Sequence, residues 1–181
     1  MNVCITGLGL ITPLGSNCDE TFDALLAEQF IQNDSLAKFP RSPSGGCVNA
    51  LTLAAARQAM MQAGWKRFPE DCAIVAGTSK GDVESWLTAI DQIQDRRSAS
   101  FSWNERLGLG DLASTLADGL DAGSCVRLTY SAACASGLDA LARAAMMIQF
   151  GEARSALVVA AESSLHSLFV GCFKRLGVLA P

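Results

Sequence analysis

The feature that most constrains the fold of this chain is a regular alternation of short apolar runs with longer segments of helical periodicity. Four runs of branched or small apolar residues predict buried strands at residues 3–6, 72–76, 126–130 and 156–161. Strands that alternate with helices pair in parallel through right-handed crossovers. The pattern therefore predicts an α/β fold, with a mostly parallel sheet and helices on both of its faces.

The helical segments follow from apolar residues at three- and four-residue steps and from capping signals. Predicted helices cover a segment capped by Ser16 and Asp19, residues 49–63, a segment after Gly81, a short stretch around 112–120, residues 134–150 and residues 165–176. Segment 134–150 is so apolar that we expect its helix to be buried on most sides. Within it, Gly137 predicts a close approach by a neighbouring backbone.

Composition excludes several classes of protein. The chain has 181 residues, of which 50% are hydrophobic and 18% charged, so residues 1–181 are expected to form one folded domain and not a disordered chain. A net charge of -4 argues against a broad basic surface for nucleic acid. The apolar opening at residues 3–14 is too short to span a membrane and contains Gly7, Gly9 and Pro13.

Seven cysteines, an odd number, occur without a CxxC pair and without the spacing of a metal site. No secretory signal precedes them. We therefore expect a reduced, cytoplasmic protein.

One of these cysteines, Cys134, stands where the predicted strand 126–130 turns into the apolar helix. A helix start offers unpaired backbone N–H groups and the positive end of the helix dipole, which lower the pKa of a thiol. A thiolate is the form that attacks a thioester. By position alone, this interpretation and that of an ordinary buried thiol stay equally open.

The residues around Cys134 carry a resemblance. The string Ser-Ala-Ala-Cys-Ala-Ser-Gly at 131–137 is similar to the active-site motif of β-ketoacyl-acyl-carrier-protein synthases. Further similar motifs follow the order of that family, at Thr-Gly-Leu-Gly 6–9, Thr-Pro-Leu-Gly 12–15, Gly-Thr-Ser-Lys-Gly 77–81, Ala-Ala-Glu 160–162 and Leu-Gly-Val-Leu 176–179. The chain thus resembles an N-terminal β-ketoacyl synthase domain of the thiolase-like fold.

The resemblance implies that Cys134 is the acyl-accepting nucleophile and that its backbone N–H is a candidate oxyanion donor. It implies acyl transfer from an acyl carrier protein, then decarboxylative condensation with malonyl carrier, in fatty acid or polyketide biosynthesis. Substrates would be carried on phosphopantetheine, and no metal or redox cofactor is implied. Expected partners are the acyl carrier protein and a second copy paired through strand 126–130, or else a second-half or related synthase subunit.

The chain also departs from the family. Two histidines, a lysine and a phenylalanine-glycine loop belong to the family's second half, and the only histidine here, His166, matches neither catalytic motif. We expect His166 to be a structural or surface imidazole. The chain is expected to lack the fifth strand of the sheet and the second half-domain, and to be incompetent for condensation by itself.

Two alternatives stay open. A thiolase acting on coenzyme A esters would share the fold and a nucleophilic cysteine, although its motif around the thiol differs. A truncated, non-catalytic chain that only binds a carrier or a partner would explain the absent histidines. A dinucleotide site after Gly7 and a phosphate loop at 77–81 are rejected, because their glycine spacing is wrong.

Overall fold

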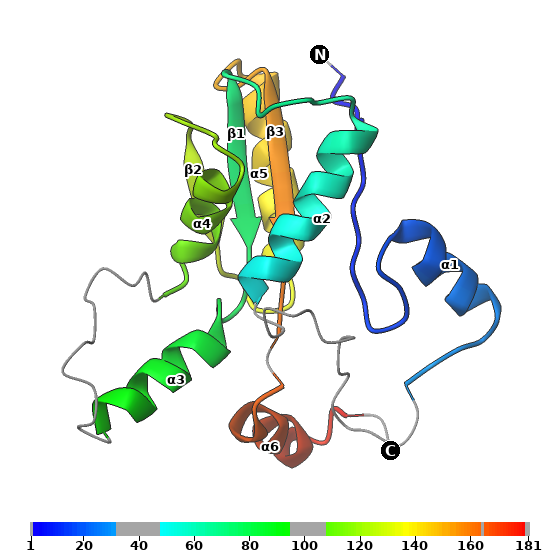
Figure 1. Ribbon diagram of the computed structural model, residues 1–181, viewed down its shortest axis with the longest axis vertical. Helices are drawn as coiled ribbons and strands as arrows, with labels where there is room; N and C mark the ends of the chain where they lie inside the picture. Colours follow the sequence, from blue (N-terminus) through cyan, green and yellow to red (C-terminus); the bar gives the residue numbers. More distant parts are fainter. Residues whose placement is uncertain (1, 32–47, 95–107, 164, 180–181) are drawn as a thin grey trace.

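The computed structural model describes residues 2–31, 48–94, 108–163 and 165–179. Its centre is a parallel three-stranded sheet in the order β2-β1-β3 (Figure 1). The strands are β1 (Cys72–Gly77), β2 (Arg127–Tyr130) and β3 (Ser155–Ala160). They confirm three of the four predicted strands, and they place β2 and β3 at the two edges.

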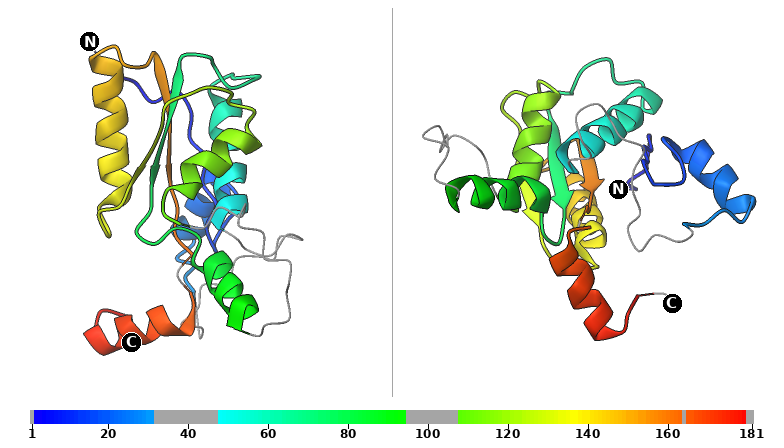
Figure 2. Two further views of the ribbon diagram at one scale, coloured as in Figure 1. Left: turned by 90° about the vertical axis from the view of Figure 1, so that its left-hand side faces the viewer. Right: turned by 60° about the horizontal axis from the view of Figure 1, so that its bottom comes forward.

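Helices cover both faces of this sheet. Figure 2 shows α2 (Val48–Gln62) and α4 (Asp111–Gly119) on one face and α5 (Ser136–Gln149) on the other. Beyond the carboxyl ends of the strands lie α3 (Val83–Gln94) and α6 (Ser167–Leu176), while α1 (Cys18–Leu26) stands to one side (Figures 1 and 2). The helices confirm the predicted α/β class.

The core is divided by the central strand, every residue of which is buried. Because side chains alternate along a strand, Ile74 and Ala76 pack among residues of α2 and α4, and Ala73 and Val75 pack against α5. Strand β1 thus reaches both layers, which explains its nearly continuous apolar sequence.

The predicted strand at residues 3–6 is wrong, because no strand forms within the described residues 2–11. This segment instead lies along α2, where the Leu8 N–H donates to Oε1 of Gln62 at 2.5 Å and the Leu10 N–H to Oε1 of Gln58 at 3.1 Å. A hollow of about 520 Å³ separates it from the outer edge of β3. Because this hollow keeps the run away from β3, it does not pair with the sheet, and Ile5 is 69% exposed.

The start of α1 also differs from the prediction by one residue. The N-cap is Asn17, whose side-chain oxygen accepts from the Glu20 N–H at 2.8 Å, and the Glu20 carboxylate accepts in turn from the Ser16 N–H. The capping contacts therefore involve Asn17 and Glu20 instead of Ser16 and Asp19, and the Glu20 carboxylate bonds the N–H one residue before the N-cap.

The described parts of the chain contain neither a membrane-spanning helix nor a cluster of metal ligands. No helix there combines the length and the apolar character needed to cross a bilayer. Nor do three or more His, Cys, Asp or Glu side chains come together there as a set of metal ligands.

Candidate active site at the carboxyl end of the sheet

Cys134 lies in the turn between β2, which ends at Tyr130, and α5, which begins at Ser136. The predicted helix start at residue 134 is therefore corrected by two residues, with Ala135 as the N-cap. The Cys134 thiol is free and exposed. Substrates of parallel α/β proteins bind at the carboxyl ends of the strands, and the thiol lies at that end.

The turn has an unusual backbone conformation just before the cysteine. Ala133 adopts a φ of 49°, in the left-handed region that non-glycine residues rarely occupy. Short backbone hydrogen bonds close the turn, from the Ala135 N–H to the Ala132 carbonyl at 3.0 Å and from the Ser136 N–H to the Ala133 carbonyl at 3.2 Å. Cys134 is thus presented on a sharp strand-to-helix corner.

A buried serine completes this corner. The Ser136 hydroxyl accepts from the Ala132 N–H at 2.9 Å and donates to the Ala133 carbonyl at 2.7 Å, with the residue only 4% exposed. The motif at 131–137 contains Ser136 but by itself assigns it no role. A serine two residues after a cysteine at a strand-to-helix junction was the available signal, since serine hydroxyls commonly bond to nearby backbone groups.

Two glycines let α5 lie close to the sheet. A Cβ at Gly137 would come within 2.8 Å of the Ala160 Cβ on β3, so the predicted neighbouring backbone is wrong and the close neighbour is a side chain. A Cβ at Gly77, the last residue of β1, would overlap the Ser136 carbonyl and lie 2.8 Å from the Gly137 nitrogen. Gly77 was not singled out from the sequence, yet its lack of a side chain lets the start of α5 lie directly against the end of β1.

A polar cluster occupies the neighbouring loops. The Glu162 carboxylate, beyond β3, accepts from the Thr78 hydroxyl at 3.1 Å and from the Ser79 N–H, and it lies 3.8 Å from the Lys80 ammonium. That ammonium also lies over the rings of Phe169 and Phe173 on α6, at 5.8 and 5.7 Å from their centres. These contacts join the loops after β1 and β3 to α6.

The turn that carries Cys134 is connected to the same region. The Ser131 hydroxyl donates to the Ser79 carbonyl at 3.4 Å, and the Thr78 N–H donates to the Tyr130 carbonyl at 3.0 Å. The three loops at the carboxyl end of the sheet are therefore held to one another.

His166 serves as the N-cap of α6. Its Nδ1 accepts from the Leu168 N–H at 3.3 Å, and the residue is exposed. This geometry agrees with the expected structural imidazole.

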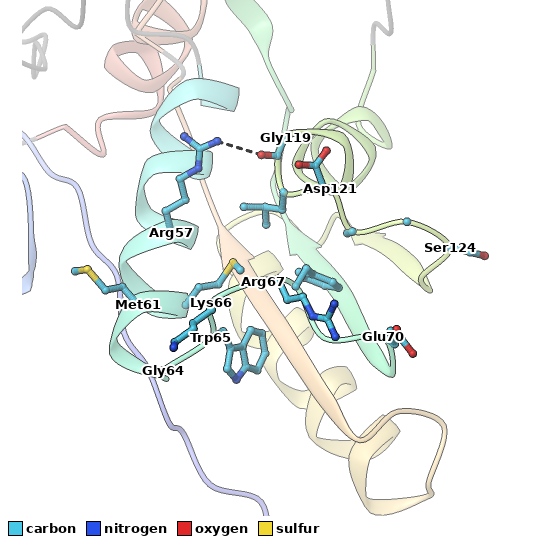
Figure 3. A pocket seen from close by; sticks show the side chains of 15 residues that line it. Arg57, Met61, Gly64, Trp65, Lys66, Arg67, Glu70, Gly119, Asp121 and Ser124 are labelled. Atoms are coloured by element: carbon cyan, nitrogen blue, oxygen red, sulfur yellow. Dashed lines mark hydrogen bonds between the residues drawn. The ribbon is translucent and has the colours of Figure 1, made fainter.

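A larger hollow, of about 1110 Å³, lies at the opposite end of the sheet, where β1 and β2 begin (Figure 3). Arg57 donates there to the Gly119 carbonyl at 3.1 Å. Lys66 and Arg67 line the same hollow, which also has the acidic side chains of Glu70 and Asp121. Because this end is remote from the carboxyl ends of the strands, we do not take the hollow as the active site.

The described cysteines differ in their surroundings. Burial raises the pKa of the Cys72 thiol, which is 3% exposed on β1. Cys4, Cys134 and Cys172 are exposed, and all six described cysteines are free. Among the exposed thiols, Cys134 alone follows the carboxyl end of a strand and precedes a helix.

Comparison with known proteins identifies the fold and the family model that fits. Residues 47–181 match the model described as Beta-ketoacyl synthase, N-terminal domain. No curated protein matches the sequence.

Solved structures share the fold at low sequence identity. The ishigamide ketosynthase/chain length factor superposes with a TM-score of 0.78 at 21% identity, over 98% of this chain and 51% of that one. The ketosynthase ApeO from Xenorhabdus doucetiae, solved in complex with its chain length factor ApeC, gives 0.72 at 22%, over 98% and 51%.

A third structure, AntDE:AntF, is a type II PKS acyl-carrier protein in complex with its ketosynthase; it gives 0.71 at 17%, over 94% and 54%. The chain therefore spans about half the length of these structures. Its sheet and helices correspond to a thiolase-like ketosynthase half-domain.

Proposed function

Since this chain belongs to the β-ketoacyl synthase family through its N-terminal domain, we propose that Cys134 accepts an acyl group from the phosphopantetheine thioester of an acyl carrier protein. The observation that carries the proposal is an exposed thiol on the sharp turn between β2 and α5, within the residues that match the family model. The carrier, the fatty acid or polyketide pathway and a cytoplasmic location are parts of the same proposal. It requires no metal or redox cofactor.

The proposed step is a thioester exchange. The Cys134 sulfur, as thiolate, attacks the acyl carbonyl carbon, and the carbonyl oxygen becomes an oxyanion for which the Cys134 N–H is a candidate donor. The carbon–sulfur bond to pantetheine then breaks, and the pantetheine thiolate leaves and takes up the proton that the cysteine released. The product is an acyl-cysteine and a free carrier thiol.

Condensation needs more than this turn supplies. In the intact reaction, malonyl carrier loses carbon dioxide and its carbanion attacks the acyl-cysteine, and the resemblance assigns the groups that assist this step to a second half. The only histidine of the chain caps α6. We therefore propose that the 181-residue chain forms an acyl-enzyme and releases no β-ketoacyl product by itself.

Two surfaces support the proposed partners. Strand β2 is an edge of the sheet, so its outer side is available for pairing with a second copy or a related subunit. The outward face of α5 is apolar and exposed, with Leu138 at 69% and Leu141 at 43%. We propose that a polypeptide equivalent to the second half of the longer relatives covers this face.

A second candidate is a non-catalytic chain that binds a carrier or a partner, and the use of His166 as a helix cap favours it over a thiolase. Intact-mass measurement separates these proposals. Acyl-carrier protein should add one acyl group to the wild-type chain and none to Cys134→Ala, whereas acyl-coenzyme A should react far more slowly.

Adding malonyl-carrier should then yield no β-ketoacyl product. Absence of any acyl adduct would favour the non-catalytic candidate, and preference for the coenzyme A donor would favour the thiolase. Condensation above the Cys134→Ala background would show that the chain supplies the assisting groups itself.

A further inference from the structure

The Ser136 hydroxyl is buried, and both of its hydrogen bonds go to the backbone of the turn that carries Cys134. It accepts from the N–H of Ala132, two residues before the cysteine, and donates to the carbonyl of Ala133, directly before it. One side chain thus fixes two consecutive residues of the turn. The link is short, at 2.9 and 2.7 Å, and shielded from water at 4% exposure.

The turn needs such a link because Ala133 is in a left-handed conformation, with a φ of 49°. In that region the Cβ of an L-residue crowds the following carbonyl oxygen, so alanine occupies it only when the surroundings hold it there. The hydroxyl of the nearby Ser131 does not hold Ala133, because it donates to the Ser79 carbonyl at 3.4 Å. Ser136 is therefore the side chain that directly stabilises the conformation of Ala133.

We propose that Ser136 is a positioning residue for Cys134, whose hydroxyl keeps the turn in the one conformation that presents the thiol to an acyl thioester. The proposal rests on the proposed function of Cys134. Ser136 touches neither the thioester nor the thiol in this account. Without its hydroxyl the turn relaxes into other conformations, and only the remaining competent fraction of molecules reacts.

The test compares single-turnover rates of Cys134 acylation by acyl-carrier protein, measured by intact mass well below the melting temperature. Ser136→Ala should lower the rate about tenfold, the effect of losing one or two buried hydrogen bonds. Ser136→Thr keeps the hydroxyl and should stay within about threefold of wild type. A matched control is Thr52→Ala on α2, which removes another buried hydroxyl with a bond to a carbonyl, that of Val48.

The control should lower the melting temperature and leave the acylation rate unchanged. A second variant separates positioning from general stability. Glycine adopts a positive φ without strain, so Ala133→Gly in the Ser136→Ala background should recover most of the lost rate. Failure of this rescue, or an equal loss of rate in Thr52→Ala, would overturn the proposal.

Alkylation by iodoacetamide makes the test independent of the carrier. Cys172 on α6 is exposed and serves as an internal reference. Ser136→Ala should lower the ratio of Cys134 to Cys172 modification about tenfold, because only the molecules that keep the turn intact present the Cys134 sulfur in its exposed position. If the wild type accepts no acyl group but this ratio falls, the proposed function fails and the positioning role stands; an unchanged ratio overturns the positioning role.

Discussion

The helices on the two faces of the sheet differ in how much of their apolar surface is buried. On one face, α2 and α4 bury a large cluster in which Leu112 and Leu116 are 2% and 1% exposed. On the other face, α5 buries only a narrow inner stripe of Ala140, Ala144 and Met147. Its outer side remains apolar and exposed, with Leu138 at 69%.

This difference indicates that the outer side of α5 is a surface for another layer of protein. Helices covering an ordinary surface have a polar outer face, as an apolar face in water gains nothing for the folded state. The prediction that segment 134–150 is buried on most sides is wrong for this chain alone, because no other described element covers its outer side. A second layer of protein packed on the outer side of α5 would bury it as predicted. Such a layer agrees with a chain that spans about half the length of its structural relatives.

The largest expected effect tests this contrast directly. Leu116→Ala should lower the free energy of unfolding by roughly 2–5 kcal/mol, because it leaves a cavity in the α2–α4 layer. Leu138→Ala on the outside of α5 should change it by less than about 0.5 kcal/mol. Chemical denaturation of both variants measures the two values, and similar losses would mean that α5 is covered in solution, for instance by self-association.

The second prediction concerns how closely α5 lies on its own face. Gly77→Ala should cost about 1–3 kcal/mol, because the new methyl group would press on the backbone of Ser136 and Gly137. Gly110→Ala is the matched control, since Gly110 has a φ of -70° and open space around its Cβ position. Thermal unfolding should separate the two, and equal melting temperatures would show that α5 can move away from the sheet at little cost.

The third prediction tests whether the outer face of α5 drives association. Replacing Leu138 and Leu141 by lysine should raise the monomeric fraction at a given concentration, about twofold or more, because charge in an apolar contact is costly to bury. The same exchange at Leu25 and Leu26 on α1, which are 57% and 67% exposed, is the control. Light scattering after size exclusion measures both, and a larger effect from α1 would assign the association to that helix.

Co-expression gives this third prediction a complementary readout. A second-half polypeptide should increase the yield of dispersed wild-type chain and have little effect on the α5 lysine variant. Equal rescue of both would point to the open edge of β3 as the source of association instead.

Much of the fold could be predicted from local pattern. The apolar runs of β1, β2 and β3 predict these strands because they are bounded by turns and flanked by helical periodicity, and the same pattern predicts the place of Cys134 between β2 and α5; its role as the nucleophile stays a prediction. The run at residues 3–6 has the same local signature but does not pair with the nearby edge of β3, and local sequence does not report pairing. Ser136 was missed for a related reason, since its role depends on the left-handed conformation of Ala133.

The smallest expected effect separates Cys72, in the α2–α4 layer, from Cys134 beside α5. Burial raises the pKa of Cys72 above its ordinary value of 9.0, so its thiol stays neutral in the folded chain where the unfolded chain would ionise it. Keeping this proton stabilises the fold fully below about pH 9, and that contribution is lost as the pH rises through the folded pKa.

Iodoacetamide should therefore modify Cys72 at least roughly tenfold more slowly than the exposed Cys134 at pH 8. Between pH 8 and 10, Cys72→Ala should lose stability less steeply than wild type. Peptide mass mapping and denaturation at each pH measure both effects, and fast modification of Cys72 would show that the α2–α4 layer opens readily and that the two faces differ less than their burial indicates.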